Sequence, residues 1–141
     1  MIEWVIPGRL ARSARPGYRG EGGGLVAASE VEGWLADAKA LGIRSMLCLL
    51  DKNQLNFYRD LPDGLLQAYR RAGMAVGHVP VEDHQAPPIP ADGLEDVERL
   101  FAALPKPLLV HCSAGLDRTG AAIEHILKTR GWADDTGSPR R

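Results

Sequence analysis

The amino-acid sequence predicts an α/β fold with a mainly parallel central sheet flanked by helices. Short apolar runs that suit buried strands alternate with longer stretches in which apolar residues recur every three to four positions. Strands that are separated by helices pair in parallel, because each connection returns across a face of the sheet. The chain has 141 residues, enough for one domain with its own core, and we expect this domain to span residues 1–131.

The N-terminal region is predicted to hold one strand followed by irregular structure. Residues 2–6 are apolar except for Glu3 and precede a proline, and they are predicted as a strand. The stretch 7–25 is rich in Gly and Arg and is predicted to be irregular. Within it, residues 20–24 read Gly-Glu-Gly-Gly-Gly, which indicates a flexible loop.

A helix and a buried strand are expected next. Ser29 and Glu32 form a Ser-x-x-Glu capping box, which places the start of the helix at Ser29. Gly42 lies where the apolar stripe of this helix ends, as is typical of the residue just past a helix C-terminus. The apolar run 45–50 then predicts an inner strand of the sheet.

The alternation continues through the second half of the chain. Residues 63–71 are predicted as a helix that stops at Gly73, and residues 74–79 as the next strand. A further helix is predicted over residues 91–104. The apolar run 107–110 then predicts a buried parallel strand.

The last predicted helix covers residues 119–130. Its apolar residues recur near every fourth position, and Gly131 lies just past its end. From residue 134 onward the chain is polar with nothing to dock in a core, so residues 132–141 are predicted as a flexible tail.

The segment that joins the last strand to the last helix carries the chemistry. It reads His-Cys-Ser-Ala-Gly-Leu-Asp-Arg-Thr-Gly over residues 111–120, so that Cys112 and Arg118 are six positions apart around Gly115. In a strand-loop-helix arrangement the loop N–H groups and the helix N-terminus form a cradle for an oxyanion. The residues expected to supply these N–H groups are Ser113, Ala114, Gly115, Leu116, Asp117 and Arg118.

The two functional side chains of this loop suit a phosphoryl group. The guanidinium of Arg118 is a planar fork that can hold two phosphate oxygens at once. Cys112 lies in the same positive field, which favours the thiolate over the thiol. The sequence therefore predicts a nucleophile that is charged at neutral pH. The alternative is that Cys112 is a buried apolar filler at a strand end.

These residues resemble the signature of the cysteine-based protein tyrosine phosphatases, and the small size resembles their dual-specificity branch. Residues 6–16 (Ile-Pro-Gly-Arg-Leu-Ala-Arg-Ser-Ala-Arg-Pro) are similar to the opening segment of the atypical dual-specificity phosphatases. The resemblance covers residues 2–130 and implies a phosphocysteine intermediate. It also implies that Thr119 donates a hydrogen bond to the cysteine sulfur, and that His111 fixes the loop without acting as a base.

The resemblance implies a general acid as well, and two aspartates are candidates. Asp83 lies 29 positions before Cys112, in a segment that is bounded by prolines, residues 79–88. An acid on a mobile loop could close over the substrate and later act as base toward water. Asp117 lies inside the phosphate loop, beside the incoming dianion. The alternatives are that Asp83 caps a turn and that Asp117 points outward and binds loop amides.

The expected activity is hydrolysis of phosphate monoesters, with phosphorylated protein as the favoured substrate. A phosphoinositide or inositol phosphate substrate is an alternative, although the loop has no Lys and one additional negative charge. Four arginines of the N-terminal segment could restore positive charge if it folds toward the site: Arg9, Arg12, Arg15 and Arg19. Alternatives of another class are a non-catalytic phosphate-binding module, a sulfurtransferase or an arsenate reductase.

The composition limits which classes of partner and which compartment we expect for this protein. The net charge is −1, which gives no global field for binding nucleic acid, and no apolar run reaches the roughly 18 residues of a membrane span. We expect a cytoplasmic monomer that needs no cofactor and no metal. Cys48 is expected to be a core thiol, with a protective disulfide to Cys112 as the alternative. Members of the family that the sequence resembles continue with further helical structure after the helix that follows the signature, whereas this chain ends soon after Gly131.

Overall fold

The structure is a computed structural model, and it describes residues 1–20 and 23–140. Within these residues, five strands form one sheet in the order β1-β2-β5-β3-β4. The strands are β1 (Glu3–Ile6), β2 (Leu10–Ser13), β3 (Ser45–Cys48), β4 (Ala75–His78) and β5 (Leu108–His111). The helices are α1 (Ala28–Ala40), α2 (Lys52–Leu55), a 3₁₀ turn (Asn56–Tyr58), α3 (Gly64–Arg71), α4 (Ala91–Ala103) and α5 (Asp117–Thr129).

The sheet is parallel except at one edge, as predicted. Strands β2, β5, β3 and β4 run in parallel, and β1 pairs antiparallel with β2. At the carboxyl end of β5, His111 is paired with Ser13 on one side and Cys48 on the other. The loop that follows β5 therefore leaves the middle of the sheet at the edge where open α/β sheets bind ligands.

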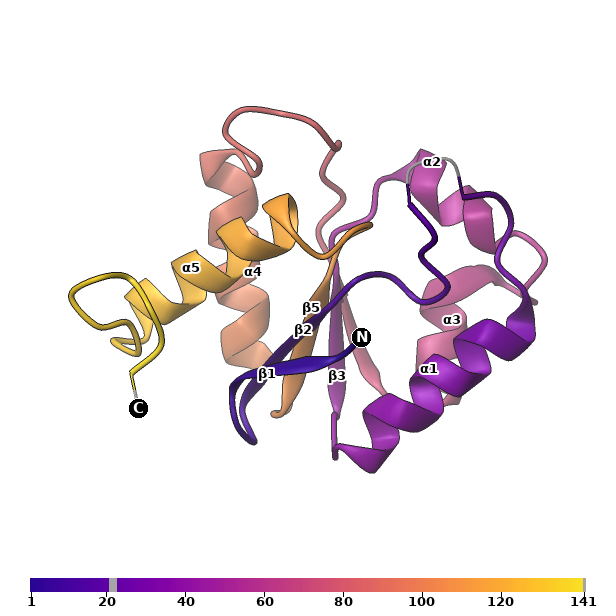
Figure 1. Cartoon of the computed structure of the whole chain (residues 1–141), viewed down its shortest axis with the longest axis horizontal. Helices are drawn as coiled ribbons and strands as arrows, with labels where there is room; N and C mark the ends of the chain where they lie inside the picture. Colours follow the sequence, from indigo (N-terminus) through magenta and orange to yellow (C-terminus); the bar gives the residue numbers. More distant parts are fainter. Residues whose placement is uncertain (21–22, 141) are drawn as a thin grey trace.

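The helices cover both faces of the sheet (Figure 1). Helices α4 and α5 lie on one side and α1 and α3 on the other. Apolar side chains of the inner strands alternate between the two layers: Leu47 and Leu49 pack in the α4/α5 core, and Met46 and Cys48 in the α1/α3 core. This two-sided burial explains why these strands are continuous apolar runs in the sequence. In the part of the chain that the structure describes, no helix is long and apolar enough to cross a bilayer.

Strand β2 corrects the prediction for the N-terminal region. It lies inside residues 7–25, which were predicted to be irregular, and it pairs with β1 and β5. Arg12 and Ser13 interrupt its apolar run, so the strand is not visible as hydrophobic periodicity. The expected flexible loop 20–24 lies partly outside the described residues.

The start of α1 also differs from the prediction. Ala27 precedes the helix in an extended conformation, and no side chain caps the helix N-terminus. Ser29 therefore lies inside the first turn, too far along to act as the cap. Gly42 follows the helix with φ of 81° and donates its N–H to the carbonyl of Lys39, as predicted.

The segment after α5 folds back on the domain. Trp132 packs edge-to-face on Phe101 with ring centroids 5.7 Å apart. The carboxylate of Asp134 accepts hydrogen bonds from the backbone N–H groups of Thr136 and Ser138, at 2.9 and 3.0 Å. Residues 132–140 thus form a hydrogen-bonded turn beside α5, and the flexibility of this tail stays a prediction. The domain boundary at residue 131 stays a prediction.

Candidate active site

The loop between β5 and α5 packs against the end of β2, the strand that was not predicted from the sequence. Gly115 has φ of 76°, and a Cβ added there would lie 2.7 Å from the backbone of Ser13 and Ala14. Both facts require glycine at this position. The carbonyl of Gly115 also accepts a hydrogen bond of 2.8 Å from Arg12. The loop conformation therefore depends on close contact with the end of β2.

The guanidinium of Arg118 is buried and only partly satisfied by the protein. Its Nη1 donates to the carbonyls of Leu49 (3.2 Å) and Val81 (2.8 Å) and to Oε1 of Gln54 (2.8 Å). Its Nε and Nη2 are buried, and among the described residues neither has a hydrogen-bond partner. Buried N–H groups without acceptors are costly and rare, so this edge of the guanidinium is prepared for an anionic ligand.

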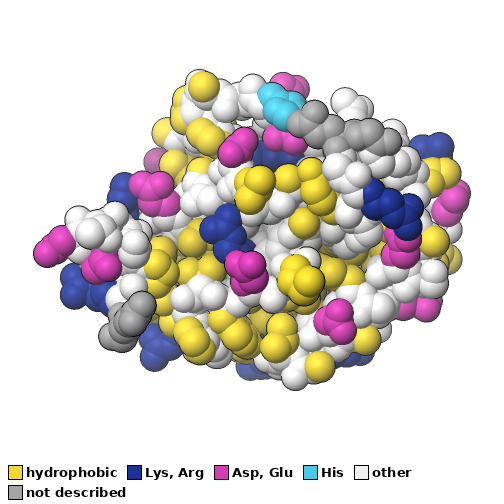
Figure 2. Space-filling model, viewed as in Figure 1, with side chains coloured by type: hydrophobic (Ala, Val, Ile, Leu, Met, Phe, Trp, Pro, Cys, Tyr) yellow, Lys and Arg dark blue, Asp and Glu magenta, His cyan; other side chains and the backbone are white. Residues whose placement is uncertain are grey.

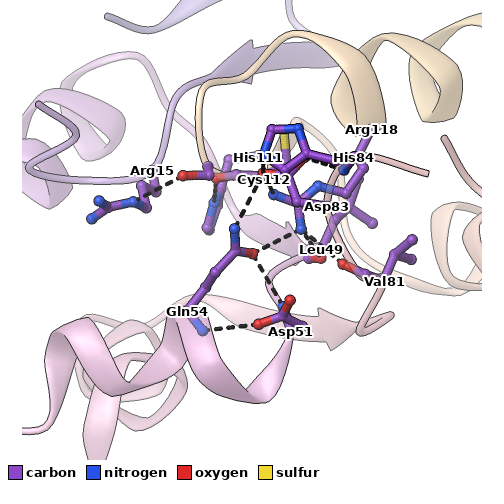
Figure 3. Close-up of polar contacts among 11 residues, drawn as sticks. Arg15, Leu49, Asp51, Gln54, Val81, Asp83, His84, His111, Cys112 and Arg118 are labelled. Carbon is purple, nitrogen blue, oxygen red and sulfur yellow. Dashed lines mark hydrogen bonds and ion pairs between the residues drawn. The ribbon is translucent and has the colours of Figure 1, made fainter. Parts of the chain in front are cut away.

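Asp83 lies beside this open edge. Its Oδ2 is 3.0 Å from Nη2 of Arg118, close enough for an ion pair although not directed as a hydrogen bond. Gln54 donates to the same carboxylate oxygen at 3.3 Å, and the backbone N–H of His84 donates to Oδ1 at 3.0 Å. Figure 3 shows the three side chains Gln54, Asp83 and Arg118 converging from three different elements.

Cys112 and both candidates for the general acid line one pocket. Its volume is about 190 Å³. It is lined by Tyr18, Asp83, His84, Cys112, Ser113, Ala114, Leu116 and Asp117. Cys112 is 2% exposed, whereas Asp117 is exposed at the first turn of α5. The structure thus brings Cys112, Arg118, Asp83 and Asp117 together, as the predicted chemistry requires.

His111 supports the loop from inside the sheet. Its Nδ1 is 3.1 Å from the carbonyl of Cys112, and its Nε2 is 2.8 Å from the hydroxyl of Tyr69. A carbonyl only accepts, so Nδ1 carries the proton and Tyr69 donates to Nε2. Burial lowers the pKa of His111 to about 4. A neutral histidine with both nitrogens occupied suits the structural role that was predicted for it.

The buried histidine predicts a loss of stability in mild acid. Below pH 6.5 the unfolded chain takes up a proton at His111, whereas the folded protein does so only near pH 4, its lowered pKa. The contribution of His111 to the free energy of unfolding should therefore fall by about 3 kcal/mol as the pH drops from 7 to 4. Urea unfolding of wild type and His111→Gln across this range tests it. The difference between the two proteins should shrink toward pH 4, and a pH-independent difference would contradict the assignment.

Thr119 does not make the hydrogen bond that was expected. Its hydroxyl is fully buried at the start of α5 and has no hydrogen-bond partner among the described residues. Helix α5 begins at Asp117, two residues earlier than predicted, so Thr119 is the third residue of its first turn. No hydrogen bond joins it to the sulfur of Cys112 in this arrangement, and its role in releasing the sulfur stays a prediction.

Two of the four N-terminal arginines fold toward the phosphate loop. Arg12 binds the Gly115 carbonyl, as described above. Arg15 is 3% exposed, and its Nε donates to Oγ of Ser113 at 3.2 Å. Its backbone N–H also donates to the Ser113 carbonyl at 2.9 Å. These two arginines bind the loop from the side of β2, and they do not line the pocket itself.

The other two arginines are engaged elsewhere. The guanidinium of Arg9 lies 5.4 Å from the ring centroid of Trp132, and Arg19 forms an ion pair with Glu30. Of the four arginines, Arg12 and Arg15 therefore contact the phosphate loop, and none of the four lines the pocket.

Gln54 is a site residue that the sequence reasoning missed. It lies on the one-turn helix α2, whose capping box joins the Asp51 side chain to the backbone of Gln54 and the Gln54 side chain to the backbone of Asp51. The signal was present as Asp-x-x-Gln directly after a buried strand. Helix α2 itself was not predicted, because four residues are too few to show a helical period.

Cys48 is a core thiol. It packs in the α1/α3 core, whereas Cys112 belongs to the α4/α5 core, and both are free cysteines. Burial raises the pKa of Cys48 to about 12, so it remains protonated at neutral pH. The alternative disulfide between the two cysteines is absent from this structure.

The ligand that these residues fit is an oxyanion. The buried, unsatisfied edge of Arg118 and the loop N–H groups can hold phosphate oxygens. Among residues 1–20 and 23–140, no three His, Cys, Asp or Glu side chains are grouped as metal ligands would be.

A buried cysteine and a partly unsatisfied arginine, joined by one loop at the carboxyl end of a parallel strand, define a cysteine-based phosphatase of the protein tyrosine phosphatase type. The family model described as "Polymorphic toxin system, DSP-PTPase phosphatase" matches residues 29–131. The chain belongs to this family, which confirms the resemblance that the loop motif indicated.

Solved structures confirm the fold. The chain is 23% identical to a kinase associated phosphatase whose catalytic cysteine is substituted by serine, with a TM-score of 0.64, covering 85% of this chain and 65% of that one. For the core catalytic domain of a PP-IP phosphatase from S. cerevisiae the identity is 21%, the TM-score 0.56 and the coverage 94% and 68%. The chain is 22% identical to Tk-PTP in its active form, with a TM-score of 0.57, covering 92% of this chain and 74% of that one. No curated protein matches the chain.

Proposed function

We propose that this protein hydrolyses phosphate monoesters through a phosphocysteine intermediate, with phosphorylated protein as its substrate. The observation that carries the proposal is the buried edge of Arg118: among the described residues its Nε and Nη2 make no hydrogen bond, and Nη2 has only the ion pair with Asp83. This edge belongs to the loop that carries Cys112, and a phosphate dianion supplies the acceptors that it lacks.

The proposed reaction has two steps. The sulfur of Cys112 attacks phosphorus, the bond from phosphorus to the leaving oxygen breaks, and Asp83 gives its proton to that oxygen. Water then attacks the phosphocysteine and gives a proton to the Asp83 carboxylate, while the sulfur–phosphorus bond breaks. Inorganic phosphate and the thiolate are the products. Asp83 pairs with Arg118 at 3.0 Å in the free protein. When the phosphate dianion binds Arg118 it replaces this carboxylate, and Asp83 then takes up a proton from solvent, which it donates to the leaving oxygen.

The pocket favours a substrate with one phosphate and an apolar body. Tyr18 and the 66% exposed Leu116 contribute apolar surface to the lining, and Asp83 and Asp117 contribute two carboxylates. Among the described residues that line the pocket there is no Lys or Arg. On the face in Figure 2, basic side chains are interspersed with acidic ones. A phosphotyrosine side chain fits this lining better than a densely charged inositol polyphosphate does.

Competing substrates test the proposal. Phosphate release should be measured with a phosphotyrosine peptide, a phosphoserine peptide and a diphosphoinositol polyphosphate. The last probes the activity named for the S. cerevisiae structure. We expect kcat/KM for the phosphotyrosine peptide to exceed that for the inositol compound by at least about tenfold, because the two pocket carboxylates repel a polyanion. A preference for the inositol compound would contradict the proposed substrate and leave the phosphatase chemistry in place.

A further inference from the structure

Gln54 connects two side chains that perform different parts of the proposed reaction. Its Oε1 accepts from Nη1 of Arg118 at 2.8 Å, and its Nε2 donates to Oδ2 of Asp83 at 3.3 Å (Figure 3). Arg118 would bind the phosphate, and Asp83 would protonate the leaving oxygen. A single amide group therefore contacts both of these groups.

The orientation of this amide follows from its partners. Arg118 carries only donors, so the atom that faces Nη1 must be the amide oxygen. The backbone N–H of Asp51 also points at this oxygen, at 3.4 Å. With the oxygen fixed by two donors, the NH₂ group has to face Asp83, where it meets a carboxylate oxygen. The amide oxygen thus accepts from Arg118, and the amide NH₂ group donates to Asp83.

The backbone of Gln54 is fixed as well. Its N–H donates to Oδ1 of Asp51 at 2.9 Å, which completes the capping box of α2. Asp51 is the third residue after the inner strand β3, and the carbonyl of Leu49, the first residue after β3, accepts a hydrogen bond from Arg118. The position of Gln54 is therefore set by the central sheet, whereas Asp83 lies on a loop bounded by prolines.

We propose that Gln54 is a positioning residue that locks Arg118 for phosphate binding and holds the loop acid Asp83 over the same site. This inference rests on the proposed function. A glutamate could not replace Gln54 in this role. Its second oxygen would place a like charge beside Asp83 and would remove the only side-chain amide that donates to Asp83 among the described residues.

Three variants test the proposal. Gln54→Met keeps the length of the side chain and removes both polar contacts, and Gln54→Glu keeps the acceptor for Arg118 but not the donor for Asp83. Asn53→Ala is the matched control, because Asn53 is the exposed neighbour on the same helical turn. Thermal unfolding verifies that each variant folds. If Gln54→Met does not, Gln54→Glu carries the test of the Asp83 contact.

Two readouts separate the two contacts. Calorimetric binding of tungstate, a phosphate-like anion, should be weakened about tenfold or more in Gln54→Met, since Arg118 loses an acceptor that fixes it. Turnover of phenyl phosphate, whose leaving oxygen needs a proton, should fall at least about tenfold more than turnover of 2,4-dinitrophenyl phosphate, whose leaving group needs none. Gln54→Glu should show the same leaving-group dependence.

A double-mutant cycle shows whether Gln54 acts through Asp83. In an Asp83→Ala background, Gln54→Met should add no further leaving-group dependence. The proposal is overturned if Gln54→Met matches Asn53→Ala in tungstate affinity and in the ratio of the two turnover rates. If wild type releases no phosphate from either ester, the proposed function fails, and the tungstate affinities alone decide whether Gln54 positions Arg118.

Discussion

Replacing Cys112 with serine is expected to reduce phosphate release by at least about 10⁴-fold. The serine hydroxyl stays protonated at neutral pH and is a much weaker nucleophile than a thiolate, and the neighbouring His111 cannot activate it because both of its nitrogens are occupied. The phosphate loop would remain intact, since Gly115, Arg12 and Arg15 do not depend on the sulfur. Hydrolysis of para-nitrophenyl phosphate in EDTA, for wild type and Cys112→Ser, measures the effect.

Two controls make the loss specific. Cys112→Ser should still bind tungstate, which would show that the anion cradle has formed. Cys48→Ala should retain turnover of the same order as wild type, because Cys48 lies in the other core and remains a protonated thiol. If Cys112→Ser hydrolysed the ester as fast as wild type, a phosphocysteine intermediate would be ruled out. If Cys48→Ala lost as much turnover as Cys112→Ser, the assignment of Cys112 as the nucleophile would be wrong.

The parts of the fold that the sequence predicts are those with a regular apolar pattern. Strands β3 and β5 are buried on both faces and appear as continuous apolar runs, and α4 and α5 show a helical period. Strand β2 is not predicted from the sequence because two of its four residues, Arg12 and Ser13, are polar. Arg12 is polar for a local reason, namely its contact with the carbonyl of Gly115, which only the folded structure places beside it.

The site residues likewise differ in whether a local sequence pattern predicts them or only the fold brings them together. Cys112 and Arg118 are close in sequence, so one motif predicts both, and Asp83, 29 positions before Cys112, was predicted as the acid from the resemblance that this motif indicates. Gln54 belongs to no such pattern, because its partners Arg118 and Asp83 come from two other elements. A contact between side chains of three elements depends on the sheet order, and local periodicity carries no information about that order.

Replacing Asp83 with alanine is expected to lower kcat for phenyl phosphate by about 10²- to 10⁴-fold, the usual contribution of a general acid. The carboxylate lies 3.0 Å from Nη2 of Arg118 and is held by the amide of Gln54, so it stands beside the place where the phosphate would bind. Turnover of 2,4-dinitrophenyl phosphate should change little. The isosteric Asp83→Asn should behave like the alanine variant, since the amide cannot give up a proton of comparable acidity.

Asp117→Ala is the matched comparison for the general acid, and we expect it to leave phenyl phosphate turnover within about threefold of wild type. Asp117 is exposed in the first turn of α5, where a carboxylate stabilises the helix through its dipole by about 0.3–1 kcal/mol. Its removal should therefore lower the free energy of unfolding slightly. If Asp117→Ala instead abolishes phenyl phosphate turnover while Asp83→Ala does not, the acid lies in the phosphate loop. The ion pair of Asp83 with Arg118 would then serve only to close the empty site.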